Sequence, residues 1–363
     1  MLYKLESLRG VAACLVVLIH SAYNFGVEPI LFVSNSYLFV DFFFILSGFL
    51  MCYAYEDKIH SGFKFYTYIA LRLGRIYPLH IFVLLLWIPY ILIRQYLYQT
   101  GFGGVEQLDK NNIYTFISNI FLVQSLGLHN SLSWNFPSWS ISTEFFAYIC
   151  FFILTVTLDK AKKIYVPLII IAGCYVFLQQ LNRSGLDITY DFGSIRCIGA
   201  FYIGVLSFRI KQNVRSTNLT ISSVNILEIM VLIAIIVGVT MAEQHYGYLY
   251  FSLFSFACAI LIFSNQKNGV LGQFLSFKLM RNIGMWSYSI YLLHSIILGG
   301  ITNILEYVFN IDPNIPQGII AIIINSSVLI ITIILSKYSY QLIEKKYRDI
   351  IKLKVRKTTH SHN

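Results

Sequence analysis

Apolar residues gather in eleven segments of about 17 to 25 residues, separated by short polar loops. A helix of that length, rising about 1.5 Å per residue, crosses a hydrocarbon layer of about 30 Å. The pattern therefore predicts an all-α, polytopic membrane protein. The segments are 6–24, 37–55, 79–97, 112–129, 138–158, 163–181, 194–210, 226–243, 247–264, 283–305 and 316–336.

The segment 112–129 is interrupted by asparagine, serine, threonine and glutamine. Such a segment is better suited to a re-entrant or interfacial element than to a lipid-exposed span. We therefore expect about ten transmembrane helices plus this one element. Lysine and arginine gather in loops on one side of that arrangement, which the positive-inside rule places in the cytoplasm with both termini. The basic loops are 56–78, 159–163, 209–215 and 265–281.

The chain divides into two predicted parts, a membrane domain over residues 1–345 and a basic cytoplasmic tail over residues 346–363. Charged and apolar side chains alternate in the tail, as in a basic helix that lies on anionic lipid. A solvated tail that only fixes the orientation of the last span explains the same residues equally well.

Composition agrees with a membrane protein, because 57% of residues are hydrophobic and only 12% charged, against about a quarter charged in soluble chains. The formal charge of +10 could indicate nucleic-acid binding, but the excess lies in short loops and the C-terminal tail. We interpret it as a topology signal and expect no nucleic-acid partner. The six cysteines lie within apolar segments without the spacing of metal ligands, so no metal site is predicted.

The first apolar segment carries Arg9 and His20, eleven positions apart. At 100° per residue the two side chains return to within about 20° of one face, separated by ~16 Å along the helix. Arg9 would lie near the cytoplasmic boundary, where it could meet a phosphate, and His20 deep in the outer half of the membrane. A positive-inside arginine and a structural histidine explain the pair equally well.

The second segment carries Asp41 near its outer end and Gly48, which permits close helix approach. Asp41 could orient His20 or cap its own helix. Arg72 and Arg75 come just before the third segment, ahead of a proline that suits a helix start. Two guanidinium groups three positions apart can hold phosphates, although cytoplasmic arginines are ordinary orientation signals.

The fifth segment begins near Trp139 and carries Ser140 and Glu144 at positions i and i+4, on one helical face. Glu144 would lie ~9 Å below the outer end of this span, at a depth that overlaps with His20. A carboxylate inside a membrane is costly, which favours a functional role. Arg196 and His294 are further candidates, for which buried ion pairing or hydrogen bonding between helices is at least as good an explanation as catalysis.

Taken together, these motifs resemble acyltransferase family three in their content and order. They are Arg9 with ten residues before His20, Phe43-Phe44-Ile-Leu-Ser47-Gly48-Phe49, Arg72-Leu-Gly-Arg75-Ile-Tyr-Pro78 and Trp139-Ser140-Ile-Ser142-Thr-Glu144. A late Ser287-Tyr288-Ser289-Ile290-Tyr291-Leu-Leu-His294 block and Glu344 extend the resemblance over almost the whole chain. The ordered set is specific, whereas each motif alone is not.

The resemblance implies a bacterial inner-membrane enzyme that moves an acyl group, commonly acetyl from acetyl-CoA, to hydroxyls of lipopolysaccharide, exopolysaccharide or other glycans. Residues 1–345 would be the acyltransferase domain. Implied partners are membrane lipids, an acyl-CoA donor and a glycan or glycolipid acceptor, and a homo-oligomer is left open.

The resemblance and the residues together predict a division of roles. Arg9, Arg72 and Arg75 would bind the phosphates of the donor. His20 would be the general base, with Glu144 or Asp41 fixing its imidazole, although an acetyl-histidine intermediate is equally open. Substrate-binding candidates are Trp139, Ser140, Arg196 and His294.

Two other classes of protein can carry the same polar residues. A proton-coupled transporter also places carboxylates and histidines in its spans, but the absence of inverted repeats or paired broken helices argues against it. In a structural membrane subunit these groups would only join helices, and such a subunit would not bind coenzyme A.

Overall fold

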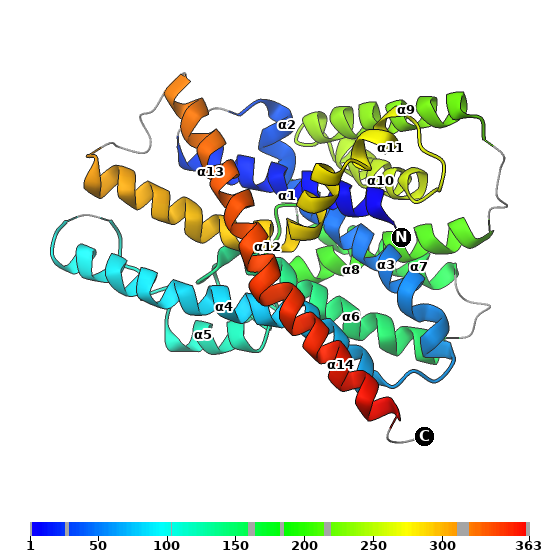
Figure 1. The fold of residues 1–363 in the computed structure, drawn as a ribbon, viewed down its shortest axis with the longest axis horizontal. Helices are drawn as coiled ribbons and strands as arrows, with labels where there is room; N and C mark the ends of the chain where they lie inside the picture. Colours follow the sequence, from blue (N-terminus) through cyan, green and yellow to red (C-terminus); the bar gives the residue numbers. More distant parts are fainter. Residues whose placement is uncertain are drawn as a thin grey trace.

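The computed structural model describes residues 2–25, 29–102, 104–158, 164–181, 185–213, 219–310 and 319–360, and these residues form helices and loops without a strand (Figure 1). The longer helices of the first half are α1 (Tyr3–Asn24), α3 (Phe39–His60), α4 (Phe65–Gln99), α6 (Trp139–Thr157) and α7 (Tyr165–Gln180). Those of the second half are α8 (Gly193–Asn213), α9 (Ile221–Met241), α10 (Tyr246–Phe263), α12 (Lys278–Asn303), α13 (Ile319–Ser339) and α14 (Lys346–His360). Short helices are α2 (Leu31–Ser34), η1 (Asn35–Leu38), α5 (Ile113–Ile120), η2 (Phe136–Ser138), α11 (Val270–Leu275), η4 (Ile304–Val308) and η5 (Tyr340–Lys345).

Nine helical stretches within the described residues are long and apolar enough to cross a membrane. The shorter apolar helix α7, of 16 residues, lies within the predicted segment 163–181. The prediction of an all-helical polytopic membrane protein is therefore confirmed. The start of α1 and the end of α14 both lie on the right of the view in Figure 1.

The predicted re-entrant or interfacial segment is confirmed as too short to span. Its helix α5 has eight residues, a length of ~12 Å. The polar side chains Thr115, Ser118 and Asn119 are buried, whereas Ile113 and Tyr114 are exposed. A polar face toward the protein and an apolar face outward are typical of a helix in contact with lipid.

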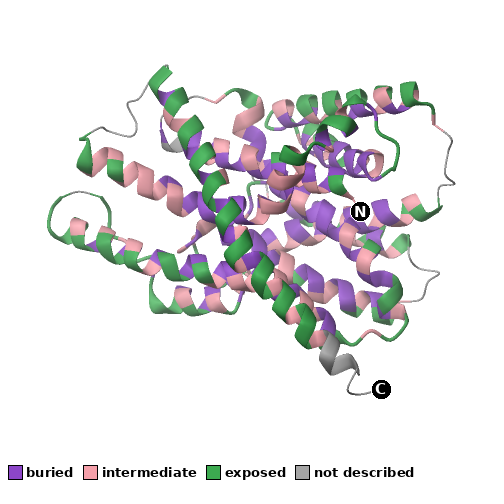
Figure 2. Cartoon of the chain, viewed as in Figure 1, coloured by how far each residue is buried: buried purple, intermediate pink, exposed green. Residues whose placement is uncertain are grey.

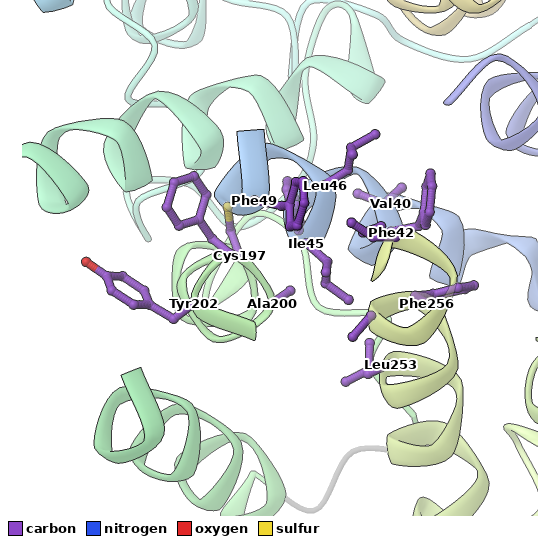
Figure 3. Packing of buried hydrophobic residues seen from close by; sticks show 14 of the residues in the cluster. Val40, Phe42, Ile45, Leu46, Phe49, Cys197, Ala200, Tyr202, Leu253 and Phe256 are labelled. Carbon is purple, nitrogen blue, oxygen red and sulfur yellow. The ribbon is translucent and has the colours of Figure 1, made fainter. Parts of the chain in front are cut away.

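The centre of the bundle is α3, which packs against α8, α6, α10 and α1. Figure 3 shows Phe42 and Ile45 of α3 close to α8 and α10, where Phe42 lies edge-on to Phe256 with ring centroids 5.6 Å apart. Gly48 of α3 and Gly204 of α8 face the partner backbone so closely that a Cβ atom on either would overlap a carbonyl oxygen. The predicted close approach at Gly48 is therefore confirmed.

A second glycine crossing joins α1 to α12. A Cβ atom on Gly10 would lie 2.7 Å from the backbone nitrogen of Gly284, and one on Gly284 would overlap the Glu6 carbonyl. Small residues at helix crossings let the backbones approach. This crossing brings the residue next to Gly10, the functional candidate Arg9, directly against α12.

The outer surface of the bundle is apolar. Helix α9 exposes Ile226, Ile229, Met230 and Ile233, with each side chain more than half exposed, while its Glu228 is buried. Exposed residues run along α9 and α13 in Figure 2. A soluble protein would bury the apolar side chains and expose the charged one. Lipid contact explains the opposite arrangement here, because hydrocarbon chains solvate aliphatic side chains well.

The last two long helices, α13 and α14, form one rod that crosses the view in Figure 1, joined through the π-helical turn η5. Residues 346–360 of the predicted basic tail form α14, which packs along α4, while residues 361–363 lie outside the described residues. Ile351 lies against Gly74, where an added Cβ atom would be 2.8 Å from the Ile351 side chain. The tail is thus continuous with the last span and attached to the bundle.

Candidate active site

An internal cavity of about 80 Å³ lies among α1, α3, α4, α6 and α12. A site of that size accommodates several water molecules or the end of an extended substrate. Its lining combines one acid, two arginines and several hydroxyl groups with an apolar floor. The residues are Arg9, Val40, Phe43, Phe44, Leu46, Ser47, Leu50, Met51, Arg75, Ile76, Ser140, Ile141, Glu144, Tyr148, Ser287, Tyr288 and Tyr291.

Glu144 is the acid of this cavity, and two hydroxyl groups hold its carboxylate. Ser47 Oγ and the Tyr148 hydroxyl donate to Glu144 Oε1 at 2.5 and 2.6 Å, and the two hydroxyl oxygens lie 3.0 Å apart. Hydrogen bonds to an ionised group are strong, so this arrangement fixes the carboxylate on the cavity wall. Oε2 makes no hydrogen bond within the described residues, which leaves it available to a bound molecule.

Arg9 and Arg75 form the basic side of the cavity. Arg9 donates from Nε to Ser287 Oγ at 2.7 Å and from Nη2 to the Gly284 carbonyl at 3.3 Å. These bonds follow directly from the glycine crossing of α1 and α12. Arg75 makes no hydrogen bond to another described residue and lies in the electrostatic field of Glu144 and Glu344.

The helix that contains the third predicted span starts earlier than expected, because α4 begins at Phe65 and continues through Pro78, so Arg72 and Arg75 are part of this helix. Arg72 is buried and donates to the Tyr55 hydroxyl at 2.5 Å, with its guanidinium 4.7 Å from the centre of the Tyr55 ring. Arg72 therefore has aromatic and polar partners within the fold, whereas Arg75 points toward the cavity.

A larger open cavity of about 880 Å³, here called the vestibule, adjoins the internal cavity, and Arg9 and Arg75 line both. Eight basic side chains and two acidic ones line the vestibule. The bases are Arg9, Lys58, Arg72, Arg75, Lys278, Arg281, Arg348 and Lys352, and the acids are Glu6 and Glu344. Three of these bases, Arg9, Arg72 and Arg75, also line a side pocket of about 340 Å³.

His20 lies beyond the internal cavity and is not among the residues that line it. Its Nδ1 is 2.8 Å from the Val16 carbonyl. Because a carbonyl only accepts, Nδ1 carries the hydrogen and Nε2 presents a lone pair. The structure does not bring Glu144 or Asp41 within hydrogen-bond distance of this imidazole, so the predicted contact with a carboxylate is absent among the described residues.

The neighbour of His20 is a second histidine. The rings of His20 and His294 lie 5.0 Å apart between centroids, and both pack on Phe136. His294 is fully buried, its Nδ1 lies 2.6 Å from the Tyr291 carbonyl, and its Nε2 has no partner within the described residues. Both imidazoles therefore present Nε2 lone pairs, because both Nδ1 hydrogens are held by their own helices.

Tyr291 contacts both the internal cavity and the histidine pair. Its hydroxyl lies 2.9 Å from Ser140 Oγ on the cavity wall, and its ring is 6.0 Å from that of His294. Tyr291 is therefore a side chain that links the cavity wall to the neighbourhood of the two imidazoles.

Asp41 and Arg196 form a buried ion pair. Neither side chain contacts His20 within the described residues. Arg196 donates from Nε and Nη2 to the two oxygens of Asp41 at 3.0 and 2.7 Å. The side chains are 0 and 1% exposed, and the guanidinium lies over the Trp139 ring at 5.5 Å. Each charge is satisfied by the other. Asp41 therefore contacts Arg196 and not the imidazole of His20, as one of its two predicted roles would require, while the substrate-binding roles of Arg196 and Trp139 stay predictions.

Several residues of the site were not singled out from the sequence. Tyr148 lies four positions after Glu144, just as Glu144 lies four positions after Ser140. The same helical spacing could therefore have predicted that Tyr148 lies beside Glu144. Ser47 and Ser287 belong to the motifs but had no assigned partner. No signal in the sequence places α14 beside the vestibule. Within the described ranges, no group of three or more His, Cys, Asp or Glu side chains could hold a metal ion.

The fold and the site define a multi-pass membrane protein with a polar cavity enclosed by its helices and open to a basic vestibule at one end. A family model described as an acyltransferase domain matches residues 2–337. The chain therefore belongs to acyltransferase family three and is an acyltransferase. It is also 31% identical over 147 residues to "Protein 2 in picA locus" of Rhizobium radiobacter, a match that covers 39% of this chain and 75% of that protein. No solved structure matches the chain.

Proposed function

We propose that this acyltransferase moves an acetyl group from cytoplasmic acetyl-CoA to a hydroxyl of a cell-envelope glycan at the outer side of the bacterial inner membrane. The observation that supports this proposal most strongly is the pair of adjoining cavities. A vestibule lined by eight bases shares Arg9 and Arg75 with a smaller cavity that contains Glu144 and an apolar floor. The basic space suits the charged carrier, and the smaller space with its apolar floor suits the uncharged acyl group.

The donor half of the proposal rests on charge and size. Coenzyme A carries a diphosphate and a 3′-phosphate, and guanidinium groups bind phosphate oxygens with directed hydrogen bonds. In the vestibule, Arg75 has no competing hydrogen bond within the described residues, and six more bases surround the space that Arg9 and Arg75 border. The charged part of the donor would stay in the wet vestibule while its thioester arm enters the cavity.

The acceptor half rests on the histidine pair. An acceptor hydroxyl that approaches from the outer side would donate its proton to Nε2 of His20 as its oxygen attacks the thioester carbonyl. The carbon–sulfur bond then breaks, and the departing thiolate takes up a proton, so that the products are an ester and coenzyme A. An acetyl-histidine route is also open, in which Nε2 itself attacks first.

Contact between the two halves requires Tyr291 to move. In the present arrangement its hydroxyl bonds to Ser140, and the cavity ends there. We propose that entry of the acyl group displaces the Tyr291 ring and exposes the imidazoles. Ser140 and His294 would then contact the substrate, while Trp139 and Arg196 support the wall behind them.

The orientation follows from the distribution of charge. The vestibule and its bases belong to the end of the bundle that carries the basic loops, which the positive-inside rule places in the cytoplasm with both termini. His20, at the opposite end of α1 from Arg9, would then face the outer leaflet. Envelope glycans are assembled on that side, which makes them the acceptor class that fits.

The test uses membranes that contain the wild-type protein or its His20→Ala variant, incubated with labelled acetyl-CoA and isolated envelope glycans. We expect labelled glycan with the wild type and none with the variant. His60→Ala is the matched control, because His60 lies at the far end of α3 and lines none of the three cavities. Full activity of His20→Ala, with equal protein in the membrane, would refute the proposed role of His20.

A further inference from the structure

We infer that the C-terminal helix α14 is a wall of the donor site, in which Arg348 and Lys352 bind phosphates of the donor. This inference rests on the proposed function and adds residues that lie outside the motifs of the membrane domain. It replaces the two sequence-based interpretations of the tail, as a lipid-bound helix or a solvated one, with a specific role in substrate binding.

The two faces of α14 differ in their surroundings, because one lines the vestibule and the other is exposed. Arg348, Lys352 and Val355 line the vestibule, and their spacing of i, i+4 and i+7 places them within about 60° of one another around the helix. The opposite face exposes the large side chains Tyr347, Ile350 and Leu353, at 47, 37 and 59%. An amphipathic helix on lipid buries its apolar face in the bilayer, so the exposed apolar face of α14 can still contact lipid. The two bases lie on the other face of the helix, where they border the space of the vestibule.

Packing holds α14 in this orientation. Ile351 lies against Gly74, one residue before Arg75, where the absence of a side chain lets α14 approach α4. The apposition brings the bases of α14 opposite those of α4 across the vestibule. A side chain at residue 74 would push the two helices apart.

Glu344 connects the start of α14 to the remainder of the site. Its side chain is 3% exposed; Oε2 accepts a hydrogen bond from Ser289 Oγ at 3.2 Å, and Oε1 lies 4.0 Å from Arg348 Nη1. Ser289 is two residues from Ser287, which holds Arg9. One helix, α12, thus positions an arginine on each side of the vestibule, and Glu344 is a positioning residue for Arg348.

The electrostatics of this arrangement point to a polyanion. Lys352 lies near Arg348, Arg72 and Arg75, which repel its charge, and near Asp349, which attracts it. Glu6 and Glu344 are the acids among the described residues of the vestibule lining. Like charges that converge in a partly enclosed space repel one another unless an anion binds between them. A ligand with several phosphates on a compact scaffold, such as the nucleotide part of coenzyme A, meets that requirement.

The test measures binding of coenzyme A to the full-length protein in nanodiscs of phosphatidylcholine, by calorimetry, for Lys352→Gln, Arg348→Gln and the double variant. Lys346→Gln is the matched control, because Lys346 is the same residue type on the same helix, is exposed, and lines none of the cavities. We expect the double variant to bind coenzyme A at least about tenfold more weakly, from the usual strength of hydrogen bonds to charged groups. Lys346→Gln should stay within about twofold of the wild type.

Adenosine 3′,5′-bisphosphate provides the second arm, because it carries phosphates without the thioester arm. It should compete with coenzyme A in the wild type and lose potency in the double variant. Equal binding of coenzyme A to the wild type and to both single variants overturns the inference and leaves the proposed function standing. A parallel measurement uses nanodiscs that contain phosphatidylglycerol. If the double variant loses binding to this lipid but keeps wild-type binding of coenzyme A, the inference is overturned in favour of a lipid-bound helix. No binding of coenzyme A to the wild type overturns the proposed donor as well.

Discussion

Buried charges in this bundle differ in how far the fold itself satisfies them. Asp41 and Arg196 are bonded to each other through two hydrogen bonds and have almost no exposed surface. Glu144, Arg9 and Arg75 instead border an open cavity, and each has hydrogen-bonding capacity directed to that cavity. Charges inside a membrane are costly, so the ion pair has a sufficient partner within the fold, whereas we propose that a bound substrate satisfies the second group.

This distinction predicts that Asp41→Asn acts on stability. Removing one partner of a buried ion pair leaves the other charge uncompensated, at a cost of about 3–5 kcal/mol. We expect a lower melting temperature of the purified protein and less protein in the membrane, with coenzyme A bound at wild-type affinity by the fraction that folds. A variant that melts like the wild type but has lost transfer activity would show that Asp41 acts in the reaction.

The same distinction predicts that Glu144→Gln acts on the reaction. The amide keeps most of the volume of the carboxylate but removes the charge that Ser47 and Tyr148 stabilise. We expect the transfer rate at saturating donor to fall at least about tenfold, because the amide accepts the two hydroxyl hydrogen bonds less strongly and no longer offers a charged oxygen to the bound acyl group, without a change in melting temperature. Tyr148→Phe, which removes one hydrogen bond, should have a smaller effect on the rate. Wild-type turnover by Glu144→Gln would remove this residue from the mechanism.

Helices position the site through two glycine crossings, α3 with α8 and α1 with α12. The first crossing presents Ser47 to Glu144, and the second presents Arg9 to Ser287. In both crossings the candidate site residue directly precedes the glycine. Ser47 precedes Gly48, and Arg9 precedes Gly10. Close backbone approach and site geometry therefore depend on the same contacts.

Gly48→Val should consequently abolish both folding and activity. A side chain at this position overlaps the Phe201 carbonyl, and the two helices must separate to accommodate it. We expect little monodisperse protein after extraction and no transfer in membranes. Gly173→Ala is the matched control, since an added Cβ atom there meets no atom within 4 Å. Normal yield of Gly48→Val would show that the crossing is not required.

The apolar segments, the short α5 and the role of Gly48 could be predicted from the sequence because each depends on local hydrophobicity or on the size of one residue. The pairing of Asp41 with Arg196 could not, because it joins positions 155 residues apart and depends on how α3 and α8 are rotated. Helical spacing likewise placed Ser140 and Glu144 on one face, but it could not show that Tyr291 stands between that face and His20. The sequence predicted a helix start near Pro78, because proline is common in the first turn of helices. That prediction was wrong, since α4 begins at Phe65 and continues through Pro78.

Across the whole molecule, the polar features lie along one path through an apolar bundle. The vestibule at one end carries the bases, the cavity in the middle carries Glu144, and the histidine pair lies beyond Tyr291. A proton-coupled transporter would use such a path to carry a solute across the membrane. An acyltransferase needs only the acyl group to pass, with the donor remaining on one side and the acceptor on the other.

The most direct test of this account is transfer across a sealed membrane. Proteoliposomes with the vestibule facing outward would receive labelled acetyl-CoA outside and contain the glycan acceptor inside. We predict labelled glycan in the lumen and free coenzyme A outside with the wild type, and neither with His20→Ala. Labelling that occurs only when donor and acceptor share one side of the membrane, or labelling by His20→Ala at the wild-type rate, would contradict it.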